Sequence, residues 1–144
     1  MSKVAKITIS VEENLLEQFD HWMQERQFPS RSEAFKSLMR GALVHHEWNE
    51  SESTDAVATL AGAITIVYDH HRATLLRKIV DIQHDFGHLI ICSQHAHLDH
   101  HHCMECIIVH GLGQEIRNLH EQLAACKGMI HTSLSMTTTG QSIP

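Results

Sequence analysis

The sequence predicts an α+β protein made of two parts, a strand–helix–helix unit over residues 1–48 and a ferredoxin-like βαββαβ domain over residues 61–136. Three observations lead to this prediction. Apolar and polar residues alternate within residues 4–11, two segments with helical spacing of apolar residues follow, and the second half alternates between strand-like and helix-like segments. Residues 49–60 open with a polar, acidic stretch that predicts a linker, and residues 137–144 are expected to form a disordered tail.

The first element is a strand with one apolar face and one polar face. The apolar positions are Ile7, Ile9 and Val11, and the polar positions are Lys6, Thr8 and Ser10. The strand–helix–helix unit offers no second strand to satisfy its backbone donors and acceptors. Two copies of the chain would solve this problem by pairing their strands antiparallel. We therefore expect an obligate dimer with a two-stranded ribbon.

Two amphipathic helices follow this strand. Each is preceded by a serine with a glutamate three residues later, the spacing of a capping box: Ser10 with Glu13, and Ser30 with Glu33. Phe28-Pro29 separates the two helices, and the second helix should end near Gly41.

The polar face of the ribbon suits the major groove of double-stranded DNA, where short polar side chains can contact base edges. The first turn of the second helix offers backbone N–H groups to a phosphate, at Ser30, Arg31 and Ser32. Net charge does not decide whether this part binds DNA, because residues 1–48 hold six lysines and arginines against seven acidic residues. The alternative is a dimerisation unit whose polar face is solvated.

The second half contains six predicted elements in the order βαββαβ. The strands are expected at 64–68, 88–98, 103–110 and 129–136, and the helices at 75–84 and 114–126. This order places both helices on one face of the sheet and leaves the other face open. Alternation predicts that Cys103, Glu105, Ile107 and Val109 share one side of their strand, and that Ile91, His95 and His97 point away from the helices. We expect Ile91, Ile107 and Val109 on the open face, where they would drive association into a tetramer, and Cys92 and Cys126 in the core.

Histidine is unusually abundant, with 15 in 144 residues and eight of them between His84 and His110. His95 and His97 are two apart on a predicted strand, so they project together, and the short loop after them folds Cys103 back beside them. His84 of a neighbouring subunit could supply a fourth ligand, and Glu105 could accept a hydrogen bond from an imidazole. A solvated polar face is the alternative for these histidines.

The identity of the metal stays open on these residues, because three imidazoles and a thiolate suit tetrahedral zinc as well as planar nickel or copper. Residues 100–102, three consecutive histidines, are expected to form a solvated loop that traps extra metal only weakly. The histidine pairs at 45–46 and 70–71 are expected to be structural or surface residues.

Several classes of protein are not expected. There is no apolar run near the length of a transmembrane helix and no signal-peptide core, which predicts a cytoplasmic protein without a membrane partner. The four cysteines are then expected to be thiols or ligands instead of disulfides. We find no nucleophile–base pair and no phosphate-binding loop, so an enzyme is not expected.

Nearly the whole chain, about residues 4–136, resembles the NikR family of nickel-responsive transcriptional repressors. The resemblance rests on KITISVEENLLEQFD and SRSEAFKSLMR in the first part, and on QH at 83–84, HAH at 95–97 and Cys103 followed by Met-Glu in the second part. It implies a ribbon-helix-helix DNA-binding domain over residues 1–48 and an ACT-like, nickel-binding tetramerisation domain over residues 61–136.

The resemblance also implies a ligand set and partners. One Ni(II) per subunit would be held in a square plane by His95, His97 and Cys103 of one subunit and by His84 of the facing subunit, within a homotetramer that is a dimer of dimers. Double-stranded DNA with a palindromic operator would be contacted by Lys6, Thr8 and Ser10. The implied outcome is repression of nickel uptake genes when nickel is bound.

Three positions depart from the family pattern. Some members carry arginine and threonine where this chain has Lys6 and Ser10, which predicts a different operator sequence. Ser37 replaces an aspartate that would pair with the acid at Glu33 to bind a structural cation, so potassium is not expected there. Two other functions stay open: a repressor of the same fold that responds to zinc or cobalt, and a metal-storage or chaperone protein supported only by the histidine loop.

Overall fold

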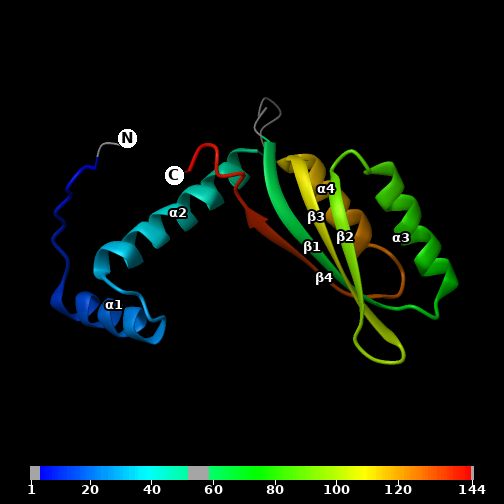
Figure 1. The fold of residues 1–144 in the computed structure, drawn as a ribbon, viewed down its shortest axis with the longest axis horizontal. Helices are drawn as coiled ribbons and strands as arrows, with labels where there is room; N and C mark the ends of the chain where they lie inside the picture. Colours follow the sequence, from blue (N-terminus) through cyan, green and yellow to red (C-terminus); the bar gives the residue numbers. More distant parts are fainter. Residues whose placement is uncertain (1–3, 52–58, 144) are drawn as a thin grey trace. The chain divides into compact units, whose positions relative to one another are not determined.

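The computed structural model describes residues 4–51 and 59–143, and the chain divides into two compact units between Gly41 and Ala42 (Figure 1). The first unit holds α1 (Glu13–Glu25) and the beginning of α2 (Arg31–Glu50). The second unit contains β1 (Thr59–Asp69), α3 (Ala73–Asp85), β2 (Ile90–His97), β3 (His102–Leu112), α4 (Gly113–Ala124) and β4 (Met129–Thr137). No helix within the described ranges is long and apolar enough to cross a membrane.

The capping prediction holds for α2 and fails for α1. The backbone N–H of Glu33 donates to the Ser30 Oγ at 3.2 Å, which satisfies one of the free donors at the start of α2. The N-cap of α1 is Glu12 and not Ser10, and it makes no side-chain capping bond. The predicted end of the second helix near Gly41 is also wrong, because an interior glycine costs a helix only about 1 kcal/mol relative to alanine.

The predicted linker over residues 49–60 overlaps the end of α2 and the start of β1. Its residues 52–58 lie outside the described part of the chain. At the other end, residues 138–143 contain no helix or strand, yet Ile143 is buried. Trp48 is buried in the second unit, and its indole N–H donates to the Thr137 carbonyl oxygen at 2.8 Å.

Residues 4–12 form no strand in the single chain. A strand requires a partner for its backbone groups, and no described strand pairs with this segment. The apolar side chains of the segment are therefore left in solvent: Ile7 is 63% exposed and Ile9 is 56% exposed. Leu15 of α1 is also exposed, and no residue of α1 is buried. The first unit alone leaves its apolar surface uncovered.

The second unit is a four-stranded sheet in the order β2-β3-β1-β4, in which every neighbouring pair is antiparallel (Figure 1). The predicted βαββαβ order is confirmed. β1 is longer than predicted, since it begins at Thr59 and not at Ile64. Inward and outward residues alternate along its whole length, as expected of a central strand with one covered face.

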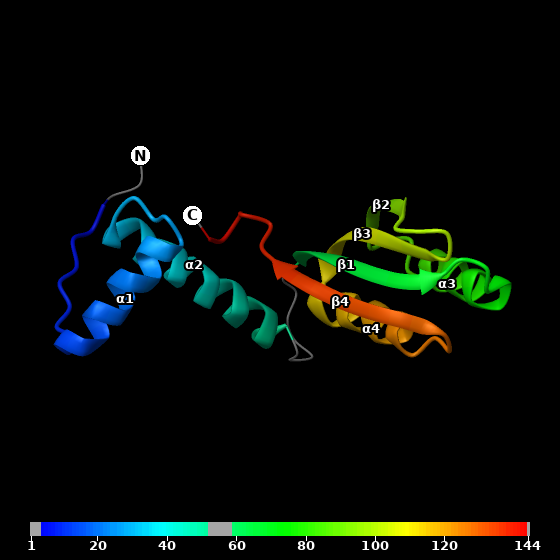
Figure 2. The same cartoon turned by 90° about the horizontal axis from the view of Figure 1, so that it is seen from below.

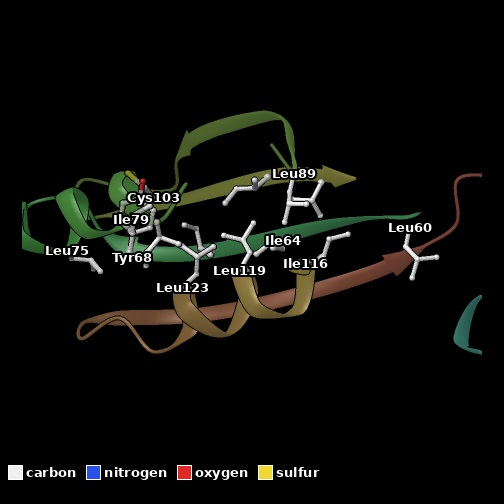
Figure 3. Packing of buried hydrophobic residues seen from close by; sticks show 14 of the residues in the cluster. Leu60, Ile64, Tyr68, Leu75, Ile79, Leu89, Cys103, Ile116, Leu119 and Leu123 are labelled. Atoms are coloured by element: carbon white, nitrogen blue, oxygen red, sulfur yellow. The ribbon is translucent and has the colours of Figure 1, made fainter. Parts of the chain in front are cut away.

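The helices α3 and α4 cover one face of this sheet. Figure 2 shows α4 lying along that face, and Figure 3 shows Leu119 and Leu123 of α4 pointing towards Ile64 and Tyr68 of β1. The buried contributors from α3 are Leu75, Ile79 and Ile82. All these side chains are almost fully excluded from solvent, so this layer is the core of the unit.

The predicted open face is wrong. Ile107 and Val109 were expected on it, but both have no exposed surface and lie in the core beneath the helices. The alternation along β3 was read correctly, but alternation shows only which residues share a face and not which face the helices cover. The open face instead carries Met104 and Ile108, both exposed.

A β-bulge explains the remaining errors on β2. The register shifts between Ile90, which pairs with Val109, and Cys92, which pairs with Ile108. The extra residue turns the rest of the strand over, so Cys92 is exposed and not in the core. Cys126 is partly buried against the core, as predicted, and all four cysteines are free thiols.

Candidate metal centre

The strand register brings the predicted ligands together at one end of the sheet. Cys103 of β3 pairs with His97 of β2 on one side and with Tyr68 of β1 on the other. Glu105, two residues further along β3, pairs with His95. Cross-strand partners lie on the same face of a sheet. All five side chains therefore lie on the helix-covered face, and the prediction that the two histidines point away from the helices is wrong.

Cys103 is the centre of the cluster. Its side chain has no exposed surface, and its Sγ lies 3.2 Å from the His97 Nδ1 and 3.2 Å from the His70 Nδ1. Burial raises the pKa of the Cys103 thiol, with smaller contributions from the carboxylates of Asp99 and Asp69. Without a metal, the cysteine is therefore a neutral thiol that can donate to a neighbouring imidazole nitrogen.

His70 is a member of this cluster that the sequence analysis missed. The ligand atoms of His70, His97 and Cys103 all lie within 4.8 Å of one another. Desolvation is the main cause that lowers the pKa of His70, and the neighbouring histidines His71 and His97 lower it further. A neutral imidazole is the form that binds metal. The available signal was the position of His70 directly after β1, whose last residue Asp69 pairs with His102.

His95 is oriented by a chain of hydrogen bonds. Glu105 is only 7% exposed, and its carboxylate accepts from the Gln83 Nε2 at 2.8 Å and from the Tyr68 hydroxyl at 3.3 Å. The Tyr68 oxygen lies 3.2 Å from the His95 Nδ1. Burial and the Glu105 charge raise the pKa of Tyr68, so its hydroxyl keeps its proton. Glu105 thus reaches an imidazole through Tyr68 and not directly.

These hydrogen bonds select one tautomer of His95. The Tyr68 hydroxyl has a single proton, which it donates in its hydrogen bond to the Glu105 carboxylate, so the Tyr68 oxygen accepts a hydrogen bond from the His95 Nδ1–H. The Nε2 of His95 then carries a free lone pair. Metal-binding histidines commonly donate their other ring N–H in this way, which fixes the ring and raises its basicity.

His84 lies in the last turn of α3, and its side chain is exposed. Among residues 4–51 and 59–143, two groups of three histidine, cysteine or acidic residues have ligand atoms within 4.8 Å of one another. His84 and His95 belong to neither group. His95 is nevertheless adjacent, because its ring centroid lies 5.0 Å from that of His97. A single chain does not bring His84 to Cys103.

The residues predicted to contact DNA lie in the first unit. Lys6, Thr8 and Ser10 are exposed on the segment that has no strand partner. The Arg31 guanidinium holds both oxygens of the Asp20 carboxylate, at 2.7 and 2.5 Å, and this hydrogen bonding lowers the pKa of Asp20. Arg31 therefore ties α2 to α1.

The donor set of the cluster fits a transition metal. It combines a thiol with imidazole nitrogens, and ligands of this softness favour zinc, nickel or copper over magnesium or calcium. The sulfur and two ring nitrogens already lie close enough to share one ion after small side-chain rotations.

Replacing Tyr68 with phenylalanine should weaken metal binding by about 10- to 100-fold, because the His95 Nδ1 loses its acceptor. Competition with a chelator of known affinity would measure the change. Thr65→Val is the matched control, since Thr65 also loses one hydroxyl of β1 but bonds to Ser133 outside the cluster. Equal affinities of Tyr68→Phe and the wild type would contradict this role of Tyr68.

Comparison with known proteins supports a metal site in this domain. Residues 61–137 match the family model described as the NikR C-terminal nickel-binding domain. A protein of Nitratidesulfovibrio vulgaris is 41% identical over 99% of both chains, and one of Syntrophus aciditrophicus is 43% identical over 98% of both. A third, from Thermococcus onnurineus, is 39% identical over 98% of this chain and 99% of its own. Each carries the name "Putative nickel-responsive regulator".

A solved structure supports the fold alone. An uncharacterized protein of Thermotoga maritima superimposes with a TM-score of 0.52 over 56% of this chain and 100% of its own, at 15% sequence identity. The sequence relatives align with both units of the chain. The matched family model covers only the domain that contains the Cys103 cluster. On these matches, the chain belongs to the NikR family.

Proposed function

We propose that this protein is a nickel-responsive transcriptional repressor in which Ni(II) binding promotes binding to an operator. The observation that carries the proposal is the meeting of the buried Cys103 thiol with the His97 imidazole, inside the domain that matches a nickel-binding family. The regulator names of relatives that align over nearly the whole chain support the same function.

The proposed ligands are the set that the family resemblance implies, with one nickel ion per chain: His95, His97 and Cys103 of one subunit and His84 of a facing subunit. His70, which contacts the Cys103 Sγ, is then a neighbour of the ion and not one of its four ligands. Val80 is 63% exposed and lies four residues before His84, so both side chains lie on the same exposed side of α3. The exposed Val80 beside the candidate ligand offers apolar surface for a subunit contact at this helix. Met104 and Ile108 on the open sheet face supply further apolar surface for a homotetramer.

The first unit is proposed to be a ribbon-helix-helix dimer. Pairing residues 4–11 with the same segment of a second chain would satisfy the backbone groups and cover Ile7, Ile9 and Leu15, which are exposed in the single chain. The polar face of the ribbon, formed by Lys6, Thr8 and Ser10, would then enter the major groove of a palindromic operator. The first turn of α2, from Ser30 to Ser32, would face a phosphate.

The two parts are coupled through the subunit arrangement. When ligands from two subunits share one site, the second units are held in a single relative arrangement. This arrangement favours simultaneous contact of both ribbons with one operator. A differential affinity of about 1–3 kcal/mol between the two states is enough for such coupling. Repression of nickel uptake genes would follow when nickel is abundant.

The first test is titration of the metal-free protein with Ni(II), followed by absorption. We expect saturation at one ion per chain with thiolate-to-nickel charge-transfer bands, because Cys103 supplies the sulfur. Cys103→Ala should lose these bands, whereas Cys92→Ala should keep them, since Cys92 is an exposed thiol of β2. Bands that persist in Cys103→Ala would overturn the ligand assignment.

The second test concerns DNA, and its probe is a pool of random-sequence duplexes. With Ni(II), the wild type should enrich a two-fold symmetric sequence. Lys6→Ala should lose enrichment while it binds nickel normally, and Cys103→Ala should lose the nickel dependence. Stronger enrichment with Zn(II) or Co(II) would reassign the metal. No enrichment with any metal would favour metal storage.

The third test concerns the ribbon. Ile9→Asp should halve the mass of the assembly in sedimentation, from tetramer to dimer, because a carboxylate would be buried without a partner. Thr8→Asp is the matched control, since Thr8 lies on the polar face of the same segment. An unchanged mass for Ile9→Asp would show that this segment does not join the subunits.

A further inference from the structure

The second half of α2 belongs to the second unit. The boundary between the two units falls between Gly41 and Ala42, inside one continuous helix. The Trp48 side chain is fully buried in the core cluster of the second unit, and Val44, one turn earlier, packs against the same cluster. Contacts that hold this half of α2 therefore also restrict the direction in which the helix leaves the second unit.

Trp48 is fixed by polar contacts with several parts of the second unit. Its indole N–H bonds to Thr137, which is the last residue of β4. Its carbonyl oxygen accepts from the Arg117 Nη2 at 3.1 Å and from the Ser51 Oγ at 2.7 Å. The Arg117 guanidinium also lies over the indole ring, 5.5 Å from the ring centroid. Trp48 is thus bonded to the point at which the C-terminal segment begins.

The C-terminal segment returns to this half of α2. Residues 138–143 run from the end of β4 towards α2 in both Figure 1 and Figure 2. The Ser142 Oγ donates to the Glu47 Oε1, and the next residue, Ile143, is only 8% exposed. We propose that residues 138–143 form a strap that holds the last turns of α2 on the second unit and transmits the metal-dependent arrangement of that unit to the helix. The transmission part rests on the proposed function.

The strap adds an attachment from a distant part of the chain. Ser142 and Glu47 are 95 residues apart in sequence, so their contact constrains the end of α2 independently of the covalent path from α2 to β1. A helix held at Trp48 alone could still rotate about that contact. A second contact, one residue earlier on the helix, opposes this rotation.

The strap is also able to open. It contains no helix or strand, and Ile143 is its one buried residue among those that the structure describes. The Glu47 Oε2 is buried and accepts no hydrogen bond within residues 4–51 and 59–143. A buried oxygen without a partner disfavours the closed state and offsets part of what burial of Ile143 contributes. The attachment is therefore reversible, as a regulatory contact must be.

The first test follows α2 in the full-length protein by hydrogen–deuterium exchange. Ile143→Asp should open the strap, because a carboxylate would be buried without a partner. Amides of residues 44–51 should then exchange about tenfold or more faster, since burial of one isoleucine side chain shifts an equilibrium by at least this factor. In a Trp22→Phe background, Trp48 is the only tryptophan left, and its fluorescence emission should move to longer wavelength.

Gln141→Asp is the matched control, since it places the same charge at an exposed position of the strap. Ser142→Ala is a milder variant that removes only the hydrogen bond to Glu47, and it should speed exchange less than Ile143→Asp. All three variants should keep the nickel charge-transfer bands, which reports that the metal-binding domain is folded.

The second test measures transmission with the duplex that the wild type enriches. The ratio of DNA affinities with and without Ni(II) should fall by about fivefold or more in Ile143→Asp, while nickel affinity measured without DNA stays unchanged. Gln141→Asp should keep the ratio of the wild type.

The outcomes separate the strap from the repressor function. Unchanged exchange in Ile143→Asp, or an equal increase in Gln141→Asp, would overturn the strap. Faster exchange with an unchanged affinity ratio would overturn its role in transmission. If the wild type binds no duplex with any metal, the repressor proposal fails, and the exchange measurement still decides whether the strap holds α2.

Discussion

The pairing register of β1, β3 and β2 is the constraint on which the candidate centre depends. It places Tyr68, Cys103 and His97 in one row across the sheet and Glu105 beside His95 in the next row. A slip by one residue would turn Cys103 and Glu105 to the opposite face. The same inward positions of β3 continue as Ile107 and Val109, which are fully buried. Packing of the core and alignment of the ligands are therefore enforced by the same hydrogen-bonded ladder.

Burial of polar groups gives this end of the core its chemical character. Cys103 and Glu105 lie among apolar side chains, where an unsatisfied polar group would be costly. Each is satisfied by partners from other elements: the thiol by two imidazoles, and the carboxylate by Gln83 of α3 and by Tyr68 of β1. The ring orientations therefore exist before any ion arrives, which is the condition for a site that binds tightly without refolding. The first unit is the opposite case, because Ile7, Ile9 and Leu15 are exposed in the single chain.

Local patterns predicted much of this molecule. The alternation of Cys103, Glu105, Ile107 and Val109 along β3 and the Ser30 cap of α2 are properties of neighbouring residues, and both are observed. The covered face was mistaken because alternation does not show where the helices pack. His70 was missed because it meets Cys103 only through the pairing of β1 with β3, across 33 residues of sequence. The length of β1 was underestimated because its first part, Leu60–Ala63, contains small residues with weak strand preference.

The bulge in β2 bears on how chain length can vary in this family. Ile91 is the inserted residue, it is 65% exposed, and it has no partner in the ladder. Between the bulge and the β2–β3 turn, His95 pairs with Glu105 and His97 pairs with Cys103, and the turn sets the register of both pairs. Loss of Ile91 would let Ile90 and Cys92 pair with the consecutive residues Val109 and Ile108, and it would leave the pairs of His95 and His97 in place. A deletion between His97 and Cys103 would displace both pairs at once. The bulge is therefore a position in β2 where one residue could be lost without shifting His95 and His97 against β3.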